Sequence, residues 1–590
     1  MNEDERYDVV IIGAGHNGTT TAAYLAKCGL SVCVLEDRPE CGGAQENAEP
    51  VAGVRICPHA VGNYAGAAPG WEQLELWKYG FRMDRNPRED SRAQMLLLMQ
   101  AGAGGVMTTD GLVPSTQKDA MGWAKISGLL TDPSHVRELL RATFWCPPHP
   151  PEVELTPENI PFMQVYKQYQ PDVWTRELLE MSMFDLMDEY METEPPKVGH
   201  AYIALMSGAH GHMEGVAIPA LMSVAACTTM YGAYDGSPMV PRGNIHGYYH
   251  ALMRCALAHG VVFRTCCPAE EIIIEHGRAV GVRLRDDAAW GEKKIWADKA
   301  VISATDIKQT FLRLIGPQHL DTGFMQRIKD LVYKGGSLYV NHFLTREPLR
   351  TRSKFQTGAR TISPEYEKRM GGNLTYMGGS FPHDSRELYF DHIADVLGRQ
   401  GNPTVPPERV PWLFIGTSSY DASHSQCTRP DRYINGDMVM MVPTPEYHPE
   451  GPDALNKIRE QMNAYMIAAL SQVAENLDSD NLVQHIVNTP YDQELRNTGM
   501  LGGSWYGLRH CRDQWWNERP LPELSRYRAP IEGLYLSHQS SAHPGGLCLM
   551  ACGYNLMHIL IEDGIAQPGD WWYPSPWYIP EKGKISAIPR

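Results

Sequence analysis

The chain has 590 residues, which is more than one hydrophobic core usually serves, so we expect two or more domains. Its composition is that of a globular protein, with 43% hydrophobic and 21% charged residues. A formal net charge of −16 disfavours nucleic acid or an anionic membrane as the main partner, because both require concentrated positive charge.

The N-terminal residues predict neither a secretory leader nor a membrane anchor. Residues 1–7 are acidic, and the apolar run after them is typical of a strand. A later apolar stretch, residues 215–234, is interrupted by Pro219 and glycines and is short for a membrane span. The thirteen cysteines lack paired metal-ligand spacing, so we interpret Cys548 and Cys552 as buried thiols. These features favour a cytoplasmic protein without a transmembrane segment.

A β-α-β pattern opens the chain. Residues 7–12 predict a buried strand and residues 31–35 a second parallel strand, with an alanine-rich helix between them. Three glycines, Gly13, Gly15 and Gly18, stand where the first strand meets the helix. The first permits a tight turn, the second lets backbone approach a pyrophosphate, and the third lets the helix lie close on the sheet.

A carboxylate and a helix N-terminus complete this pattern. Glu36 follows the second strand, 21 residues after Gly15. It can accept hydrogen bonds from both adenosine ribose hydroxyls, and its charge repels a 2′-phosphate. The first helical turn, which contains Asn17, supplies amide donors and a partial positive charge for phosphates. The sequence therefore predicts a site for an adenine dinucleotide.

The residues after Glu36 favour FAD over NAD. Arg38 and the pair Gly42 and Gly43, followed by Ala44, resemble the extended fingerprint of FAD-binding flavoproteins of the amine oxidase and phytoene desaturase superfamily. The resemblance implies a Rossmann-type domain in which the glycine pair lets a second stretch of backbone reach the pyrophosphate and the ribityl chain. Arg38 would either contact phosphate or brace the loop, and both interpretations remain open.

Two distant segments extend the resemblance. Residues 241–284 look like the superfamily's return to the FAD domain, with a helix, a strand and a hairpin at residues 276–277, and backbone at Ala269 would border the adenine. Residues 530–564 are similar to the closing signature of the phytoene-desaturase-like branch, in which a strand, here residues 534–536, precedes a His-Pro-Gly-Gly turn and a helix.

In that branch, amides of the glycine turn stabilise charge on the reduced flavin, which here implies Gly546 and Leu547. The cofactor-binding residues implied in total are Gly13, Gly15, Asn17, Gly18, Glu36, Arg38, Gly42, Gly43, Ala44, Ala60, Val61, Ala269, Gly545, Gly546 and Leu547.

The residues before the C-terminal signature also match the branch, whereas the signature itself differs from it at several positions. Gln514 and Arg519, the latter followed by proline, match the Gln and Arg-Pro that precede the last strand in this branch. By contrast, three glycines that are usual in this branch are absent. Leu547 stands in place of the glycine that follows the pair, His59 stands in place of another, and the glycine expected near His538 is missing. These differences lie around the expected flavin ring, so they affect the substrate and the reaction more than the cofactor.

The predicted fold class is α/β, a Rossmann-type FAD-binding domain with a discontinuous α+β substrate-binding domain. The aromatic C-terminal tail would pack against its own chain or against a neighbouring subunit, with its own chain favoured, and a homo-oligomer is left open. The predicted boundaries are residues 1–100, 235–310 and 520–565 for the FAD domain, 101–234 and 311–519 for the substrate domain, and 566–590 for the tail.

Four residues are candidates for catalysis. His59 would lie close to the flavin ring and act as a base or position the substrate, and His543 would do the same from the other end or brace its turn. Tyr506 and Arg509 precede the last strand, where substrate-facing residues are expected, and Arg509 suits a carboxylate or phosphate. For each of the four, a structural role is the simpler alternative.

Other kinds of site have less support. His200, His210 and His212 lie close together, but no carboxylate or cysteine stands at ligand spacing, and the glycines around them favour a loop. We therefore predict no metal site. No Gly-x-Ser-x-Gly elbow supports a serine hydrolase.

The resemblance implies an FAD-dependent desaturase or dehydrogenase that removes a hydride from a C–C bond of a small organic substrate and transfers it to flavin N5. A flavin-dependent ene-reductase or isomerase and an amine oxidase are the enzymatic alternatives. A non-catalytic scaffold stabilised by FAD is the alternative outside enzymes. The electron acceptor is not predicted.

Overall fold

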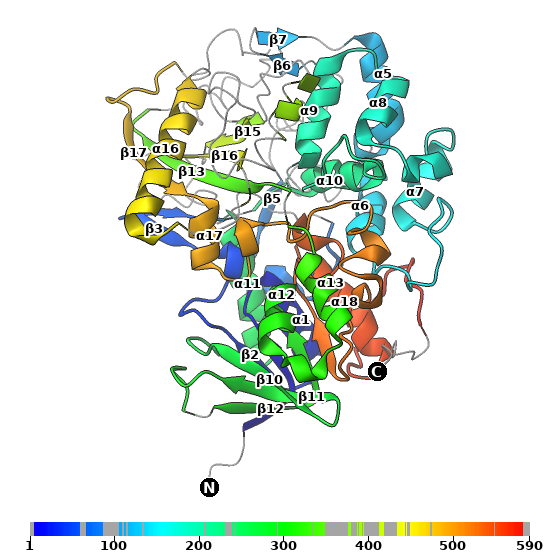
Figure 1. Cartoon of the computed structure of the whole chain (residues 1–590), viewed down its shortest axis with the longest axis vertical. Helices are drawn as coiled ribbons and strands as arrows, with labels where there is room; N and C mark the ends of the chain where they lie inside the picture. Colours follow the sequence, from blue (N-terminus) through cyan, green and yellow to red (C-terminus); the bar gives the residue numbers. More distant parts are fainter. Residues whose placement is uncertain are drawn as a thin grey trace.

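A computed structural model gives the fold of this chain, with two sheets at opposite ends of the molecule (Figure 1). β1, β10, β11 and β12 lie at the end near the N-terminus, and β13, β15 and β16 lie at the other. The structure describes residues 5–59, 67–85, 106–108, 111–113, 116–131, 135–205, 208–230, 239–241, 244–291, 293–333, 335–347, 376–378, 386–387, 389–391, 393, 412–417, 434–442, 444, 449–471, 475–547 and 549–581.

The sheet near the N-terminus contains the predicted β-α-β unit. β1 (Glu5–Ile12) leads into α1 (His16–Lys27) and then into β2 (Val32–Leu35), which pairs with β1 in parallel. The strand order is β10-β11-β12-β1-β2-β9, with β18 beside β12. The remaining strands are β9 (Val262–Arg264), β10 (Ala269–Glu275), β11 (Arg278–Leu284), β12 (Lys294–Ser303) and β18 (Leu534–Leu536).

The strands of this sheet come from three separated stretches of the chain, residues 5–35, 262–303 and 534–536. β12 pairs in parallel with both β1 and β18, and β2 pairs in parallel with β9. β10 and β11 form the predicted antiparallel hairpin. The mainly parallel sheet with its helices confirms the predicted α/β fold, while the domain boundaries stay predictions.

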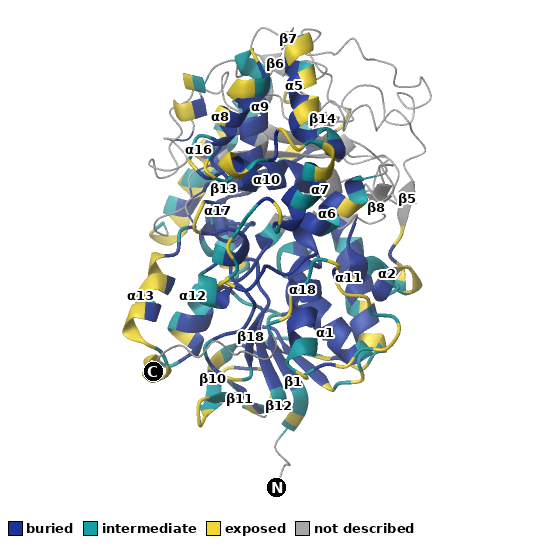
Figure 2. Cartoon of the chain, turned by 90° about the vertical axis from the view of Figure 1, so that its right-hand side faces the viewer, coloured by how far each residue is buried: buried dark blue, intermediate teal, exposed yellow. Residues whose placement is uncertain are grey.

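Alternate residues of β1 pack against helices on opposite faces. Val9 and Ile11 belong to a core shared with Tyr24 of α1, whereas Val10 and Ile12 belong to a second core shared with α12 and α13. A strand buried on both faces is expected in a sheet that helices cover on both sides, and residues 9–12 of β1 are buried (Figure 2). The helices are α11 (Asn244–Ala258) and α18 (Ala551–Glu562) beside α1, and α12 (Ile307–Gln309) and α13 (Thr322–Asp330) opposite.

The second sheet is antiparallel, in the order β14-β15-β16-β13-β17. Every residue of β13, which lies between β16 and β17, is buried. Its strands are β13 (Ser337–Thr345), β14 (Tyr376–Gly378), β15 (Trp412–Thr417), β16 (Ile434–Val442) and β17 (Leu482–Asn488), with α16 (Gly451–Ser471) and α17 (Pro490–Arg496) nearby.

A group of helices lies beside the second sheet (Figure 1). They are α5 (Gln117–Ser127), α6 (Val136–Phe144), α7 (Pro161–Tyr169), α8 (Met183–Tyr190), α9 (Glu194–Leu205) and α10 (Ala217–Met230). The smaller elements are α2 (Pro69–Gln73), β3 (Ala48–Val51) with β4 (Val54–Ile56), β5 (Met83–Arg85) with β8 (Met239–Pro241), and β6 (Val106–Thr108) with β7 (Gly111–Val113).

One local prediction is wrong. We expected a loop around His200, but this residue lies inside α9, where its Nδ1 is 2.6 Å from the carbonyl oxygen of Pro196. The glycines that suggested a loop fall mainly after α9, near His210 and His212. Glycines that follow a helix can therefore suggest a loop at residues that are helical.

Among the described residues, no three metal-binding side chains gather at one point, and no helix combines the length and hydropathy needed to cross a bilayer.

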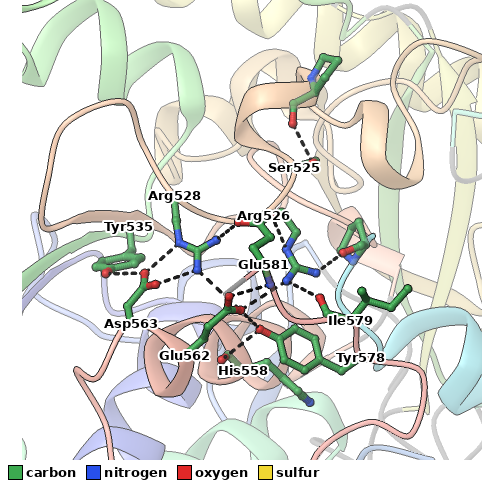
Figure 3. A network of polar contacts seen from close by, with 12 residues as sticks. Ser525, Arg526, Arg528, Tyr535, His558, Glu562, Asp563, Tyr578, Ile579 and Glu581 are labelled. Carbon is green, nitrogen blue, oxygen red and sulfur yellow. Dashed lines mark hydrogen bonds and ion pairs between the residues drawn. The ribbon is translucent and has the colours of Figure 1, made fainter. Parts of the chain in front are cut away.

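The C-terminal tail packs against its own chain. Trp571 and Trp572 contact Tyr24 of α1, with ring centroids 6.1 and 5.6 Å away. Figure 3 shows the ion-pair network around Glu581 of the tail. Arg528 binds Asp563 at 2.7 Å and Glu581 at 2.5 Å, so a residue of the tail is tied to the loop before β18.

Candidate cofactor and active site

The turn between β1 and α1 requires glycine at two positions. Gly13 has φ +102°, and a Cβ there would lie 2.9 Å from the Ala304 carbonyl oxygen. At Gly18 a Cβ would overlap the Gly13 carbonyl oxygen. Helix α1 therefore lies close on the end of β1. No side chain caps its N-terminus, so its first amides remain available to a ligand.

The glycine pair brings a second stretch of backbone to this turn. Gly42 and Gly15 form a parallel bridge, and a Cβ at Gly43 would lie 3.0 Å from the Gly15 Cα. At Gly15 itself, the nearest heavy atom to an added Cβ would be 3.9 Å away, at Gly43. Space is therefore left open in front of Gly15, as a ligand that approaches the backbone requires.

Glu36 is buried at the end of β2 and is held by two backbone amides. Its carboxylate accepts hydrogen bonds from the N–H of Ala14 at 2.9 Å and the N–H of Arg38 at 3.1 Å. Burial raises the pKa of Glu36, and the two amide donors oppose that shift. The amides fix the orientation of the carboxylate at the edge of the pocket.

A pocket opens where these elements meet, with about 930 Å³ of space, its opening to solvent included. Asn17 lies in its wall, and Asn17 Oδ1 is buried without a hydrogen-bond partner among the described residues. A buried acceptor of this kind costs about 1–3 kcal/mol unless a ligand supplies a donor. The predicted residues that line the pocket are Gly13, Gly15, Asn17, Glu36, Arg38, Gly43, Ala44 and Ala269.

The other predicted cofactor residues lie elsewhere. Gly18 and Gly42 support the turn from outside the pocket wall. Ala60 and Val61 fall outside the described residues. Gly545, Gly546 and the backbone of Leu547 form a short 3-10 helix that is not part of the pocket lining.

Arg38 braces a buried ionic cluster at the border of the pocket. Its guanidinium pairs with Glu46, whose side chain is fully buried. Arg496 binds the same carboxylate at 2.7 Å, and His59 Nε2 lies 3.3 Å from it. Burial, followed by the charges of Arg496 and Arg38, lowers the pKa of His59 to about 3, so its imidazole is neutral.

The C-terminal glycine turn is occupied by protein contacts. The Gly546 N–H donates to the Tyr506 carbonyl oxygen at 3.2 Å, and a Cβ at Gly546 would overlap the Trp505 carbonyl oxygen. Arg519 is completely buried beneath this turn. Its guanidinium donates to five backbone carbonyl oxygens, those of Tyr506, Leu508, Gln514, Gln539 and Ala542, at 2.9–3.2 Å.

Three of the catalytic candidates make structural contacts away from the pocket. The Tyr506 hydroxyl donates to the Gly336 carbonyl oxygen, and His543 Nε2 lies 2.7 Å from the Thr143 carbonyl oxygen. Burial lowers the pKa of His543 to about 3. The Arg509 backbone N–H donates to Val332, and the Arg509 side chain faces His210, whose pKa it lowers together with burial. These contacts support the structural alternatives for Tyr506 and His543.

Several pocket residues were not predicted. His16 begins α1, and His538 and Gln539 follow β18. Burial lowers the pKa of both histidines to about 3. The position of His538 just after a parallel strand was a usable signal, since ligands bind at the carboxyl ends of such strands. The remaining unpredicted lining residues include Gln309, Arg313, Asn497, Thr498, Gly499 and Met500.

Comparison with known proteins identifies the cofactor. A family model described as FAD dependent oxidoreductase matches residues 8–79, which contain most of β1 and all of α1 and β2. A second, described as FAD binding domain, matches residues 175–318, which contain β9 to β12. The chain is an FAD-dependent oxidoreductase.

Relatives resemble this oxidoreductase along nearly its whole length. One of the subunits of limonene dehydrogenase from Castellaniella defragrans is 22% identical, with 97% of each chain covered. Pyridine nucleotide-disulfide oxidoreductase domain-containing protein 2 of Rattus norvegicus is 25% identical, with 94% of each chain covered.

Solved structures share the fold at low sequence identity. Wild-type putrescine oxidase bound to putrescine is 14% identical, with a TM-score of 0.53 over 94% of this chain and 98% of that one. Cyclohexylamine oxidase from Brevibacterium oxydans is 13% identical, with a TM-score of 0.52 over 95% and 100%.

Proposed function

We propose that this oxidoreductase is a dehydrogenase that forms a C–C double bond in an uncharged organic substrate. FAD supplies a hydride acceptor at its flavin N5. The adenosine end would lie at Glu36 and Ala269, and the diphosphate at Gly15 and the first amides of α1. The open space at Gly15 and the unpartnered Asn17 Oδ1 are the observations that fit this cofactor.

The observation that carries the substrate class is that the histidines at the described site carry no charge, since they are buried. His16 and His538 in the pocket wall and His59 beside it have pKa values lowered to about 3, so all three are uncharged at neutral pH. The Glu46 carboxylate already has two arginine partners. A protonated amine would find no unpaired carboxylate in this cluster, whereas an uncharged hydrocarbon requires none.

The aromatic residues near the C-terminus also favour an uncharged substrate over an amine. In an amine oxidase such residues would form a cage beside the flavin, but Trp571 and Trp572 pack on α1, and the Tyr506 hydroxyl donates to a backbone carbonyl oxygen. None of these three side chains lines the pocket. The likeness to two amine oxidases concerns the fold alone, while the whole-length relative named as a limonene dehydrogenase agrees with C–C oxidation.

We assign the proton that must leave to His59, whose neighbour Glu46 pairs with the pocket residue Arg38. Loss of a hydride builds positive charge on the substrate, and the adjacent C–H bond then becomes strongly acidic. A neutral imidazole of low pKa is a sufficient acceptor for such a proton, and Glu46, 3.3 Å away, would stabilise the resulting imidazolium. This order, hydride first and proton second, suits a site that contains only weak bases.

Anaerobic flavin reduction tests the proposal. Limonene, as an uncharged probe, should bleach the visible flavin absorption of the purified holoenzyme, and putrescine should leave it unchanged. Bleaching by putrescine alone would replace the proposal with an amine oxidase. Reoxidation of dithionite-reduced enzyme by an activated alkene, without bleaching by limonene, would instead support the ene-reductase alternative.

A further inference from the structure

The pocket has a second wall that comes from the other half of the molecule. Residues 497–500, which we call the strap, follow α17 and line the same pocket as the glycine turn. α17 is fixed to the second sheet, because the buried Gln493 donates to the Leu338 carbonyl oxygen of β13. The same segment is thus anchored in one half of the molecule and faces the cofactor pocket of the other.

Two contacts fix the strap on the FAD side. Arg496, immediately before it, binds the buried Glu46 at 2.7 Å. Gln309 of α12, itself a pocket residue, donates its Nε2 hydrogen to the Thr498 carbonyl oxygen. Because one contact stands before the strap and the other within it, its backbone has little freedom to move away from the pocket.

The orientation of the Asn497 amide follows from its local hydrogen bonds. Asn497 Oδ1 accepts the N–H of Gly499 at 3.1 Å, which directs Nδ2 to the opposite side. On that side, Nδ2 would be 3.7 Å from a Cβ built on Gly43. Within the described chain no acceptor takes a hydrogen bond from Nδ2. A neutral donor therefore lies beside Gly43 in the lining of the pocket.

We propose that Asn497 is a cofactor-binding residue whose Nδ2 donates to the diphosphate of FAD, and that Arg496 positions it through Glu46. Phosphate oxygens are acceptors only, so an amide N–H is a suitable partner. The α1 amides and Asn497 then hold the diphosphate from two sides. This inference depends on FAD as the cofactor and is independent of the substrate.

The release of FAD from the holoenzyme tests the role of Asn497. We expect Asn497→Ala to release FAD about three- to tenfold faster, measured as the return of free-flavin fluorescence after dilution. Asn497→Asp should release it at least about tenfold faster still, because a carboxylate would face the diphosphate. The exposed Asn456 of α16 gives the matched control, Asn456→Asp, with release as in the wild type.

The two variants also distinguish the diphosphate from a sugar hydroxyl. A hydroxyl would donate to the new carboxylate, so wild-type release by Asn497→Asp would overturn the assignment. Equal rates of FAD release from the Asp and Ala variants would overturn the assignment as well, because the added negative charge would then have no effect on the bound cofactor. Near-UV circular dichroism of the FAD-free variants checks that the strap substitutions leave the fold intact.

A double-mutant cycle tests the positioning role of Arg496. Arg496→Met should speed FAD release several-fold in the wild-type background and have almost no further effect in Asn497→Ala. Additive effects in the double variant would show that Arg496 acts on FAD by another route and would contradict its assignment as a positioning residue.

Discussion

Gly15 and Gly546 belong to two glycine motifs that both predicted contact with FAD, and the structure gives them opposite surroundings. In front of Gly15 the position of a Cβ is open, with the nearest atom at 3.9 Å. At Gly546 the same position is filled by the Trp505 carbonyl, and the glycine amide already donates to Tyr506. One glycine leaves room for a ligand, and the other lets two segments of the chain pack closely.

The regions around them differ in the same way. Within the part of the chain that the structure describes, the N-terminal turn has a buried acceptor without a hydrogen-bond partner, Asn17 Oδ1, and a helix N-terminus without a side-chain cap. The C-terminal turn rests on Arg519, whose five donor contacts are all made to backbone carbonyls. At these two turns, the unsatisfied groups lie where we expect the ligand, and the satisfied groups lie where two segments of the chain pack together.

The largest expected effect comes from Gly546→Ala. The new methyl group would overlap a backbone carbonyl, and we expect the free energy of unfolding of the FAD-free protein to fall by at least about 3 kcal/mol. Urea unfolding followed by tryptophan fluorescence measures this change. Gly291→Ala is the matched control, because its Cβ meets no atom within 4 Å. Wild-type stability in Gly546→Ala would refute the close packing assigned to this turn.

A smaller change in the free energy of unfolding is expected from protonation of His543, which belongs to the same C-terminal turn. Its pKa is about 3 in the folded protein and near the ordinary 6.5 in the unfolded chain. Between these values the unfolded chain binds the extra proton, so the stability that neutral His543 contributes is present above about pH 6.5 and is lost as pH falls. Its loss amounts to about 2 kcal/mol between about pH 6.5 and pH 5.

The variant His543→Gln should therefore lose less stability than the wild type on acidification, by about 2 kcal/mol over that interval. Urea unfolding at both pH values measures the difference. The exposed His319 provides the control variant His319→Gln, which removes a histidine outside the C-terminal turn. An unchanged acid dependence in His543→Gln would mean that His543 is accessible to protons in the folded state.

Local patterns predicted the parts of this molecule that local chemistry determines. The strand–glycine–helix–strand order up to Glu36 and the strand at residues 534–536 follow from short-range periodicity and turn residues, and the structure contains both. The strap could not be predicted, because its place at the pocket depends on how α17 docks on β13 and on an ion pair between Glu46 and Arg496. Local sequence patterns do not predict such long-range contacts.

The C-terminal motif shows the other limit of sequence reasoning. A glycine is equally compatible with contact to a ligand and with contact to another backbone, and only the neighbours in space distinguish the two. His200 illustrates the same point for secondary structure, since glycines after a helix suggested a loop within it.

Binding of FAD by Gly15→Ala tests the central distinction most directly. Gly15 has φ −71°, which alanine adopts freely. The free energy of unfolding of the FAD-free variant should therefore lie within about 0.5 kcal/mol of the wild-type value. Its methyl group would fill the space in front of the turn, and the dissociation constant for FAD, measured by flavin fluorescence titration, should rise at least tenfold, or about 1.4 kcal/mol. An unchanged dissociation constant in a folded Gly15→Ala protein would contradict the assignment of this pocket to FAD.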